Sequence, residues 1–219
     1  MRLIGVGVGP GDPEHLTLKA LRALQEADRV FVPEGGRAAE IIAAHVTSVP
    51  LAFGMSDAAA RDARWNAAGA AIAEVARTGT AAFATVGDPN LYSTFAYIAH
   101  TVRELVPDVV VETVPGITAM QDLAARSGTV LAEGTERLAL IPYTAGDDAL
   151  RSALTDYDTV VVYKGGRHLP AVLRAVGDDA VYGEELGRPG ETLTPPPGAA
   201  PYFSTVIRPA TRDGRGSRL

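Results

Sequence analysis

The stretch that most constrains the fold is T-A-A-F-A-T-V-G-D-P-N-L-Y-S-T-F-A-Y-I, residues 80–98. Within 81–86 only Thr85 is polar, and polar and apolar positions do not alternate. Such a run is typical of a strand covered on both faces, as in a parallel sheet. Gly87-Asp88-Pro89-Asn90 ends the strand, because these residues favour turns and proline cannot donate to the strand ladder. Ligands of open α/β sheets bind beyond the carboxyl ends of strands, so we expect a ligand at this turn.

Strand and helix patterns alternate along the first half of the chain, which predicts parallel pairing with right-handed crossovers. The strands are expected at 3–8, 29–32, 80–86 and 109–114, and the helices at 16–24, 38–45, 57–77 and 92–105. The second half predicts helices at 116–127, 147–154 and 170–176, and strands at 137–143, 159–163, 180–184 and 202–207. Residues 187–201 are rich in proline and glycine and predict a surface loop. We therefore expect an N-terminal α/β domain over 1–115 and a C-terminal α/β domain over 116–219 that ends in a frayed, polar tail.

Composition excludes several classes of chemistry. The 219 residues include no cysteine, which excludes disulfides, thiolate catalysis and thiolate metal sites. The four histidines have no metal-ligand spacing, so we expect no metal: His15, His45, His100 and His168. A net charge of −6 argues against nucleic-acid binding through a general positive field. No apolar run approaches the roughly 20 residues that span a membrane, and Leu3-Ile4-Gly5-Val6 follows the start directly, without the features of a signal peptide, so we expect a cytoplasmic protein.

The glycine-rich run G-V-G-V-G-P-G-D-P, from Gly5 to Pro13, is not a dinucleotide-binding fingerprint. In G-x-G-x-x-G counted from Gly5 the last position is Pro10, and counted from Gly7 it is Asp12. A P-loop is excluded as well, because its lysine is missing. Two interpretations remain: a tight strand-to-helix turn, or a loop that lets a ligand approach bare backbone.

Two further loops each allow a structural and a functional interpretation. Asp88 could cap the following helix or bind a ligand amine or hydroxyl. Neither Ser93 nor Thr94 lies in G-x-S-x-G, and no base is near them in the sequence, which argues against a nucleophile. In V-E-T-V-P-G-I-T-A-M, residues 111–120, Thr118 stands near a helix start, where its hydroxyl and free backbone N–H groups could meet a ligand.

In combination the three loops are far more specific than each one alone. G-x-G-P-G-D-P, then G-D-P-x-L-Y-S-T, then P-G-I-T-A, in this order and spacing, resemble the tetrapyrrole methylase family over 3–208. The resemblance implies two α/β domains, with a mostly parallel sheet in the first and a mixed sheet in the second. It also implies S-adenosylmethionine (SAM) as methyl donor in the cleft between them, a tetrapyrrole substrate and a homodimer.

Other segments resemble one branch of that family, which methylates a corrin precursor at a ring-bridging carbon. They are Y-S-T-F-A-Y after G-D-P, L-A-E-G-T-E-R-L-A-L-I-P at 131–142, V-V-Y-K-G at 161–165 and P-Y-F-S-T-V-I at 201–207. One departure is K-G-G at 164–166 in place of the more usual K-V-G. Alternatives that stay open are another corrin-ring methylase, a methylase of the cobalt-loaded substrate, a nucleotide-binding oxidoreductase and a non-enzymatic SAM-binding module.

The resemblance also implies which residues contact the cofactor: Pro10, Gly87, Asp88, Leu91, Tyr92, Ser93, Thr118, Ala119 and Lys164. Among these, Asp88 is the side chain that we expect to make a polar contact. Basic residues that could bind substrate carboxylates are Arg37, Arg61, Arg64, Arg126, Arg167 and His168. The sequence singles out no catalytic base.

Overall fold

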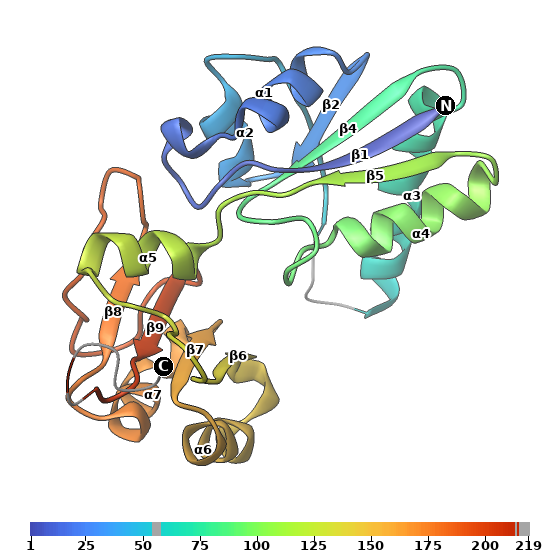
Figure 1. The fold of residues 1–219 in the computed structure, drawn as a ribbon. Helices are drawn as coiled ribbons and strands as arrows, with labels where there is room; N and C mark the ends of the chain where they lie inside the picture. The colour runs from blue at the N-terminus through green and yellow to red at the C-terminus, as the bar shows by residue number, and fades with distance from the viewer. Residues whose placement is uncertain (54–57, 213, 215–219) are drawn as a thin grey trace. The chain divides into compact units, whose positions relative to one another are not determined.

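The computed structural model describes residues 1–53, 58–212 and 214. Contacts between Cα atoms divide the chain into two units, Met1–Thr118 and Ala119–Leu219 (Figure 1). Each unit is an α/β structure with its own sheet.

The sheet of the first unit has five parallel strands in the order β3-β2-β4-β1-β5. They are β1 (Arg2–Gly7), β2 (Arg29–Pro33), β3 (Val49–Leu51), β4 (Thr80–Thr85) and β5 (Val110–Val114). The predicted parallel sheet is confirmed. Strand β3 was not predicted, because three residues around Pro50 are too few to show a pattern. In the register of β1 with β4, Gly7 lies beside Thr85, so the loops that follow these two strands start together.

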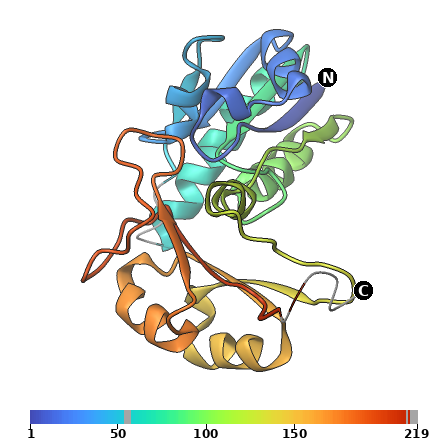
Figure 2. The same cartoon turned by 60° about the vertical axis from the view of Figure 1, so that its left-hand side comes forward.

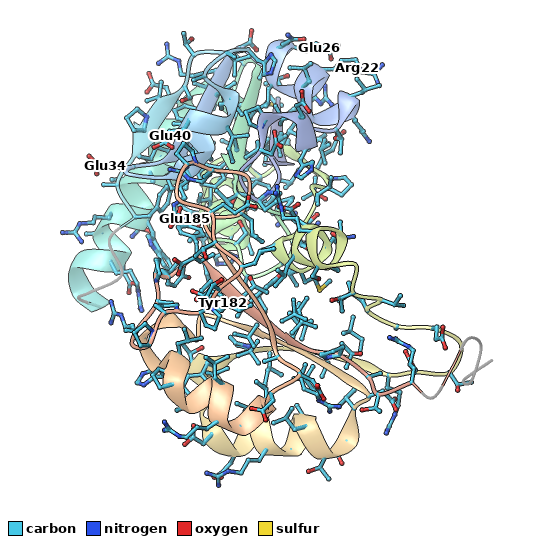
Figure 3. The ribbon with its side chains drawn as sticks, turned by 90° about the vertical axis from the view of Figure 1, so that its left-hand side faces the viewer. Arg22, Glu26, Glu34, Glu40, Tyr182 and Glu185 are labelled. Atoms are coloured by element: carbon cyan, nitrogen blue, oxygen red, sulfur yellow. The ribbon has the colours of Figure 1, made fainter. Side chains whose placement is uncertain are left out.

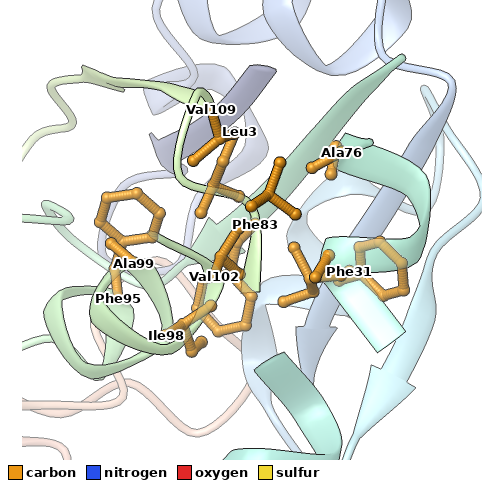
Figure 4. Close-up of a cluster of buried hydrophobic side chains, with 13 residues drawn as sticks. Leu3, Phe31, Ala76, Phe83, Phe95, Ile98, Ala99, Val102 and Val109 are labelled. Atoms are coloured by element: carbon orange, nitrogen blue, oxygen red, sulfur yellow. The ribbon is translucent and has the colours of Figure 1, made fainter. Parts of the chain in front are cut away.

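Helices cover both faces of this sheet (Figure 1). Helices α1 (Leu18–Gln25) and α2 (Arg37–Ile42) pack on one face, and α3 (Ala58–Ala76) and α4 (Phe95–Leu105) on the other. Successive strand residues point to opposite faces. Leu3 and Phe83 therefore lie in the cluster against α3 and α4 (Figure 4), whereas Ile4 belongs to the cluster against α1 and α2.

Two helices of the first unit begin later than predicted. Helix α4 begins at Phe95 and not at Tyr92, because Tyr92 has a left-handed φ of 51°, which a helix does not tolerate. Residues Pro13–His15 form a separate 3₁₀ turn, in which the Asp12 carboxylate accepts a hydrogen bond from the Glu14 N–H. Helix α1 then starts after Thr17, whose hydroxyl accepts a hydrogen bond from the Ala20 N–H at 3.0 Å.

The sheet of the second unit is mixed, as predicted, with the order β6-β7-β9-β8. Its strands are β6 (Leu138–Pro142), β7 (Thr159–Tyr163), β8 (Val181–Glu184) and β9 (Ser204–Arg208). Strand β6 is parallel to β7, and β9 runs antiparallel to both β7 and β8. Helix α5 (Ala119–Ser127) covers one face, and α6 (Asp147–Asp156) and α7 (Leu169–Val176) cover the other (Figures 1 and 2).

Arg212 lies in the segment that was expected to be frayed, but it is held in place. Its guanidinium donates to the Glu136 carboxylate, with Nε 2.9 Å from Oε1, and to the carbonyl of Val130 at 3.2 Å. Residues 213 and 215–219 of the expected tail lie outside the described residues. In the part of the chain that the structure describes, no helix is both long and apolar enough to cross a membrane.

Candidate functional site

Three loops of the first unit meet through glycines. Gly7 ends β1, Gly87 follows β4 and Gly116 follows β5. A Cβ atom added to Gly116 would lie 2.2 Å from the Gly87 carbonyl oxygen, and one added to Gly7 would lie 2.5 Å from the same oxygen. Both distances are far below van der Waals contact, so any side chain at Gly7 or Gly116 would force the loops apart. The three motifs that are weak separately therefore form one junction of backbone.

Hydrogen bonds join the same loops. The Gly87 N–H donates to the Gly9 carbonyl at 2.8 Å, and the Val8 N–H donates to the Thr85 carbonyl at 3.0 Å. These bonds connect the loop after β1 to the loop after β4. Pro10, which follows Gly9, is buried beside this connection.

The Asp88 carboxylate connects the loop after β4 to the loop after β5. Its Oδ1 accepts from the Asn90 N–H at 2.8 Å, and its Oδ2 accepts from the Gly116 N–H at 3.1 Å. Thr94 occupies the N-cap position of α4. The interpretation of Asp88 as a helix cap is therefore wrong, and its carboxylate instead fixes two backbone segments.

The outer side of Gly87 is open. Its φ is +70°, and an added Cβ would meet no heavy atom within 4 Å. A few residues later Tyr92 also has a positive φ, and the residue is 43% exposed. Partial burial raises the pKa of the Tyr92 hydroxyl. Non-glycine residues in the left-handed region cost free energy and are concentrated at functional sites. The loop thus presents bare backbone at a place where a ligand can approach.

Ser93 helps to hold the start of α4. Its hydroxyl donates to the Thr85 hydroxyl at 3.1 Å and accepts from the Phe95 N–H at 3.2 Å. These contacts give Ser93 a structural task next to Leu91 and Tyr92. Among the residues that the structure describes, no group of three or more His, Cys, Asp or Glu side chains could hold a metal ion.

In the second unit, the two predicted cofactor contacts lie near a single tyrosine. Ala119 is the first residue of α5, and Lys164 directly follows β7 with a φ of +59°. Tyr163, the last residue of β7, accepts a hydrogen bond from the Met120 N–H at 2.8 Å. Thr118, the last residue of the first unit, is buried directly before α5.

The structure thus sorts the predicted residues by unit. Seven lie in the first unit: Pro10, Gly87, Asp88, Leu91, Tyr92, Ser93 and Thr118. Ala119 and Lys164 lie in the second. The sequence reasoning missed Gly7 and Gly116 as members of the junction, although both stand in the motifs, in G-x-G and P-G-I-T. It also missed Tyr163. The position of this residue at the end of an apolar strand does not indicate that its hydroxyl accepts a hydrogen bond from the Met120 N–H.

The predicted basic residues differ in how far their charges are engaged. Arg126 forms ion pairs with Asp122 at 2.9 Å and with Glu191 at 2.8 Å, and Asp122 is almost fully buried. Arg61 lies 5.1 Å from the centre of the Trp65 ring. In the turn after Lys164, Arg167 and His168 are exposed.

Residues 2–200 match the family model of the tetrapyrrole (corrin/porphyrin) methylases. The chain belongs to this family. Its parallel first sheet and mixed second sheet confirm the predicted fold class, and family membership argues against a nucleotide-binding oxidoreductase.

Among the relatives, a precorrin-2 C(20)-methyltransferase from Sinorhizobium sp is 32% identical over 239 residues, covering 97% of this chain and 96% of that protein. A cobalt-precorrin-2 C(20)-methyltransferase from Salmonella typhimurium is 30% identical over 228 residues, covering 94% of this chain and 95% of that protein. Among solved structures, the uroporphyrin-III C-methyltransferase from Thermus thermophilus, complexed with S-adenosylhomocysteine, is 25% identical and superposes with a TM-score of 0.68 over 94% of this chain and 96% of that one.

Proposed function

We propose that this chain is a cytoplasmic, SAM-dependent C-methyltransferase that methylates precorrin-2 at C-20 and produces precorrin-3A. The observation that carries the proposal is the similarity to the precorrin-2 C(20)-methyltransferase from Sinorhizobium sp, which covers 97% of this chain and 96% of that protein. The relative that was solved with S-adenosylhomocysteine supports the same donor.

The loops of the first unit fit such a donor chemically. SAM contains no phosphate, so its site needs neither a P-loop lysine nor the dinucleotide fingerprint. It presents an adenine edge, ribose hydroxyls, an amine and a carboxylate, which backbone N–H and carbonyl groups can bind. The open outer side of Gly87 leaves room for a ligand against backbone. We assign this backbone surface to Pro10, Gly87, Leu91 and Tyr92, and Asp88 supports it through its bond to the Gly116 N–H.

When bound, SAM supplies a methyl group on a sulfonium, which an electron-rich carbon can accept by in-line displacement. That chemistry requires of the protein only close approach, alignment and exclusion of water. Side chains with strong nucleophilicity are unnecessary, which agrees with the structural task of Ser93. The rigid glycine junction helps to align the methyl donor with the substrate carbon, because it leaves the three loops little freedom to move relative to one another.

The substrate carries many carboxylates, whereas the protein has a net charge of −6. Local basic groups must therefore receive the substrate. We assign this role to Arg167 and His168, which are exposed in the turn after the proposed cofactor contact Lys164. Arg126 is a poor candidate, because its guanidinium already pairs with Asp122 and Glu191.

The runner-up function is methylation of cobalt-precorrin-2 at the same carbon, which the Salmonella typhimurium relative supports at nearly equal identity. A non-enzymatic SAM-binding module is a further alternative, and it predicts binding of SAM without turnover.

The decisive experiment is incubation with SAM and precorrin-2, and in parallel with cobalt-precorrin-2, followed by mass and carbon NMR analysis of the products. We expect one added methyl group at C-20 from the metal-free substrate. A methyl group at another carbon would contradict the branch assignment, and turnover of the cobalt substrate alone would favour the runner-up. Calorimetry with SAM and with NAD tests the class: binding of NAD without binding of SAM contradicts the proposal.

We also propose a homodimer, on the resemblance to the family. Light scattering coupled to size-exclusion chromatography measures the mass directly. A mass equal to one 22.8 kDa chain across micromolar concentrations would contradict it.

A further inference from the structure

Helix α5 is attached to the sheet of the second unit at its first turn. The first N–H groups of any helix have no partner within the helix and need an acceptor elsewhere. For Met120 that acceptor is the Tyr163 hydroxyl, at an N–O distance of 2.8 Å. No residue of α5 itself supplies this bond, so the position of the first turn depends on β7.

The strand pattern explains why Tyr163 reaches α5. In β7, Val160 and Val162 point to the cluster that contains α6 and α7, whereas Val161 and Tyr163 point to the cluster that contains Leu123 of α5. With the period of two along a strand, the residue at position 163 must face α5. A large residue with a terminal oxygen at this position can both pack against the helix and accept from its backbone.

The same tyrosine directly precedes Lys164, which is held at a φ of +59°. Gly165 turns back to the opposite face, where an added Cβ would lie 3.1 Å from Val172. Tyr163 is therefore the point at which the first turn of α5 and the loop after β7 are connected. Ala119 and Lys164, the two cofactor contacts proposed for the second unit, lie on either side of this connection.

We infer that Tyr163 is a positioning residue for the methyl donor: its hydroxyl fixes the first turn of α5 relative to Lys164, so that both face the cofactor in one geometry. This inference rests on the proposed function. It assigns to Tyr163 no contact with the reacting atoms. Its effect passes through the Met120 N–H and the backbone of Ala119.

The test is Tyr163→Phe, which keeps the ring and removes the hydroxyl that accepts from the Met120 N–H. The matched control is Tyr182→Phe, which removes a hydroxyl bonded to Glu184 on the other face of the same sheet, away from α5. Loss of one hydrogen bond corresponds to about a five-fold change in an equilibrium constant. We expect about a five-fold higher Kd for SAM in Tyr163→Phe by calorimetry, a raised KM for SAM with kcat retained at saturation, and wild-type values in the control.

The Met120 amide supplies a second measurement that a purely structural role elsewhere would not move. In wild-type protein without ligand, its hydrogen exchange should already be slow, and in Tyr163→Phe it should become fast. Thermal unfolding verifies that both variants are folded. Equal SAM affinity in wild type and Tyr163→Phe, or fast exchange of Met120 in wild type, would overturn the inference and leave the proposed function intact. Failure of the wild type itself to bind SAM would overturn both.

Discussion

Asp88 accepts a hydrogen bond from the backbone N–H of Gly116 at 3.1 Å, across 28 residues of sequence. The carboxylate also accepts from the Asn90 N–H. One side chain therefore fixes the turn after β4 and attaches it to the loop after β5. Asp88 therefore supports the backbone of both loops, and its direct contact with the cofactor stays a prediction.

We predict that Asp88→Ala weakens SAM binding by about ten-fold, because a charged acceptor of two hydrogen bonds contributes on the order of 1.5–3 kcal/mol. Calorimetry measures the affinity. Asp28→Ala is the matched control: Asp28 accepts from the Thr80 N–H at 2.8 Å at the amino-terminal edge of the same sheet, far along the strands from the loops. It should lower stability and leave the Kd for SAM unchanged. Equal effects of the two variants on Kd would contradict the assignment.

Gly116→Ala should destabilise the first unit and abolish SAM binding. The new methyl group would lie 2.2 Å from the Gly87 carbonyl oxygen, and overpacking against backbone costs about 1–3 kcal/mol or more. Thermal unfolding and calorimetry measure the two effects. Gly198→Ala is the control, because an added Cβ there meets no atom within 4 Å. A Gly116→Ala protein with wild-type melting and binding would show that the loops do not meet as described.

Stability should fall as the pH rises above about 10, in part through Tyr182 (Figure 3). Burial, together with the hydrogen bond that Tyr182 donates to Glu184, raises the pKa of its hydroxyl above the ordinary value of about 10. The native state therefore keeps the proton at a pH where the unfolded chain loses it. The stabilisation is complete below pH 10 and is lost as the pH rises toward the raised pKa.

Urea unfolding at a series of pH values tests this prediction. The free energy of unfolding of wild-type protein should decrease more steeply above pH 10 than that of Tyr182→Phe. Parallel curves for the two proteins would show that Tyr182 is not responsible.

Arg126 and Arg167, which the sequence analysis grouped as candidates for binding substrate carboxylates, should behave differently when substituted. Arg126→Met breaks the ion pair with the buried Asp122 carboxylate, and breaking a buried ion pair costs about 3–5 kcal/mol, so the melting temperature of the variant should fall sharply. Arg167→Met changes an exposed side chain and should melt like wild type. If Arg167 receives a substrate carboxylate, its variant should instead raise the KM for the tetrapyrrole. An unchanged KM would assign substrate binding to other basic residues.

The sequence by itself determined the alternation of strands and helices, the parallel first sheet and the family. These are local or ordered properties: apolar runs between turn residues define strands, and three motifs in a set order define the methylase. The late start of α4 could not be predicted from the sequence, because the left-handed φ of Tyr92 depends on the surrounding turn. Strand β3 could not be predicted either, because three residues around a proline have no periodicity of their own.

Only the tertiary structure decided what the motif residues do. Gly7, Gly87 and Gly116 are separated by long segments, and nothing local indicates that a side chain on two of them would strike the backbone of the third. The roles of Asp88 and Tyr163 are equally invisible in the local sequence, since each side chain accepts a hydrogen bond from a backbone N–H that is distant in sequence. Such contacts depend on strand register and helix placement, which are set by the packing of each whole unit, and so no residue pattern reveals them.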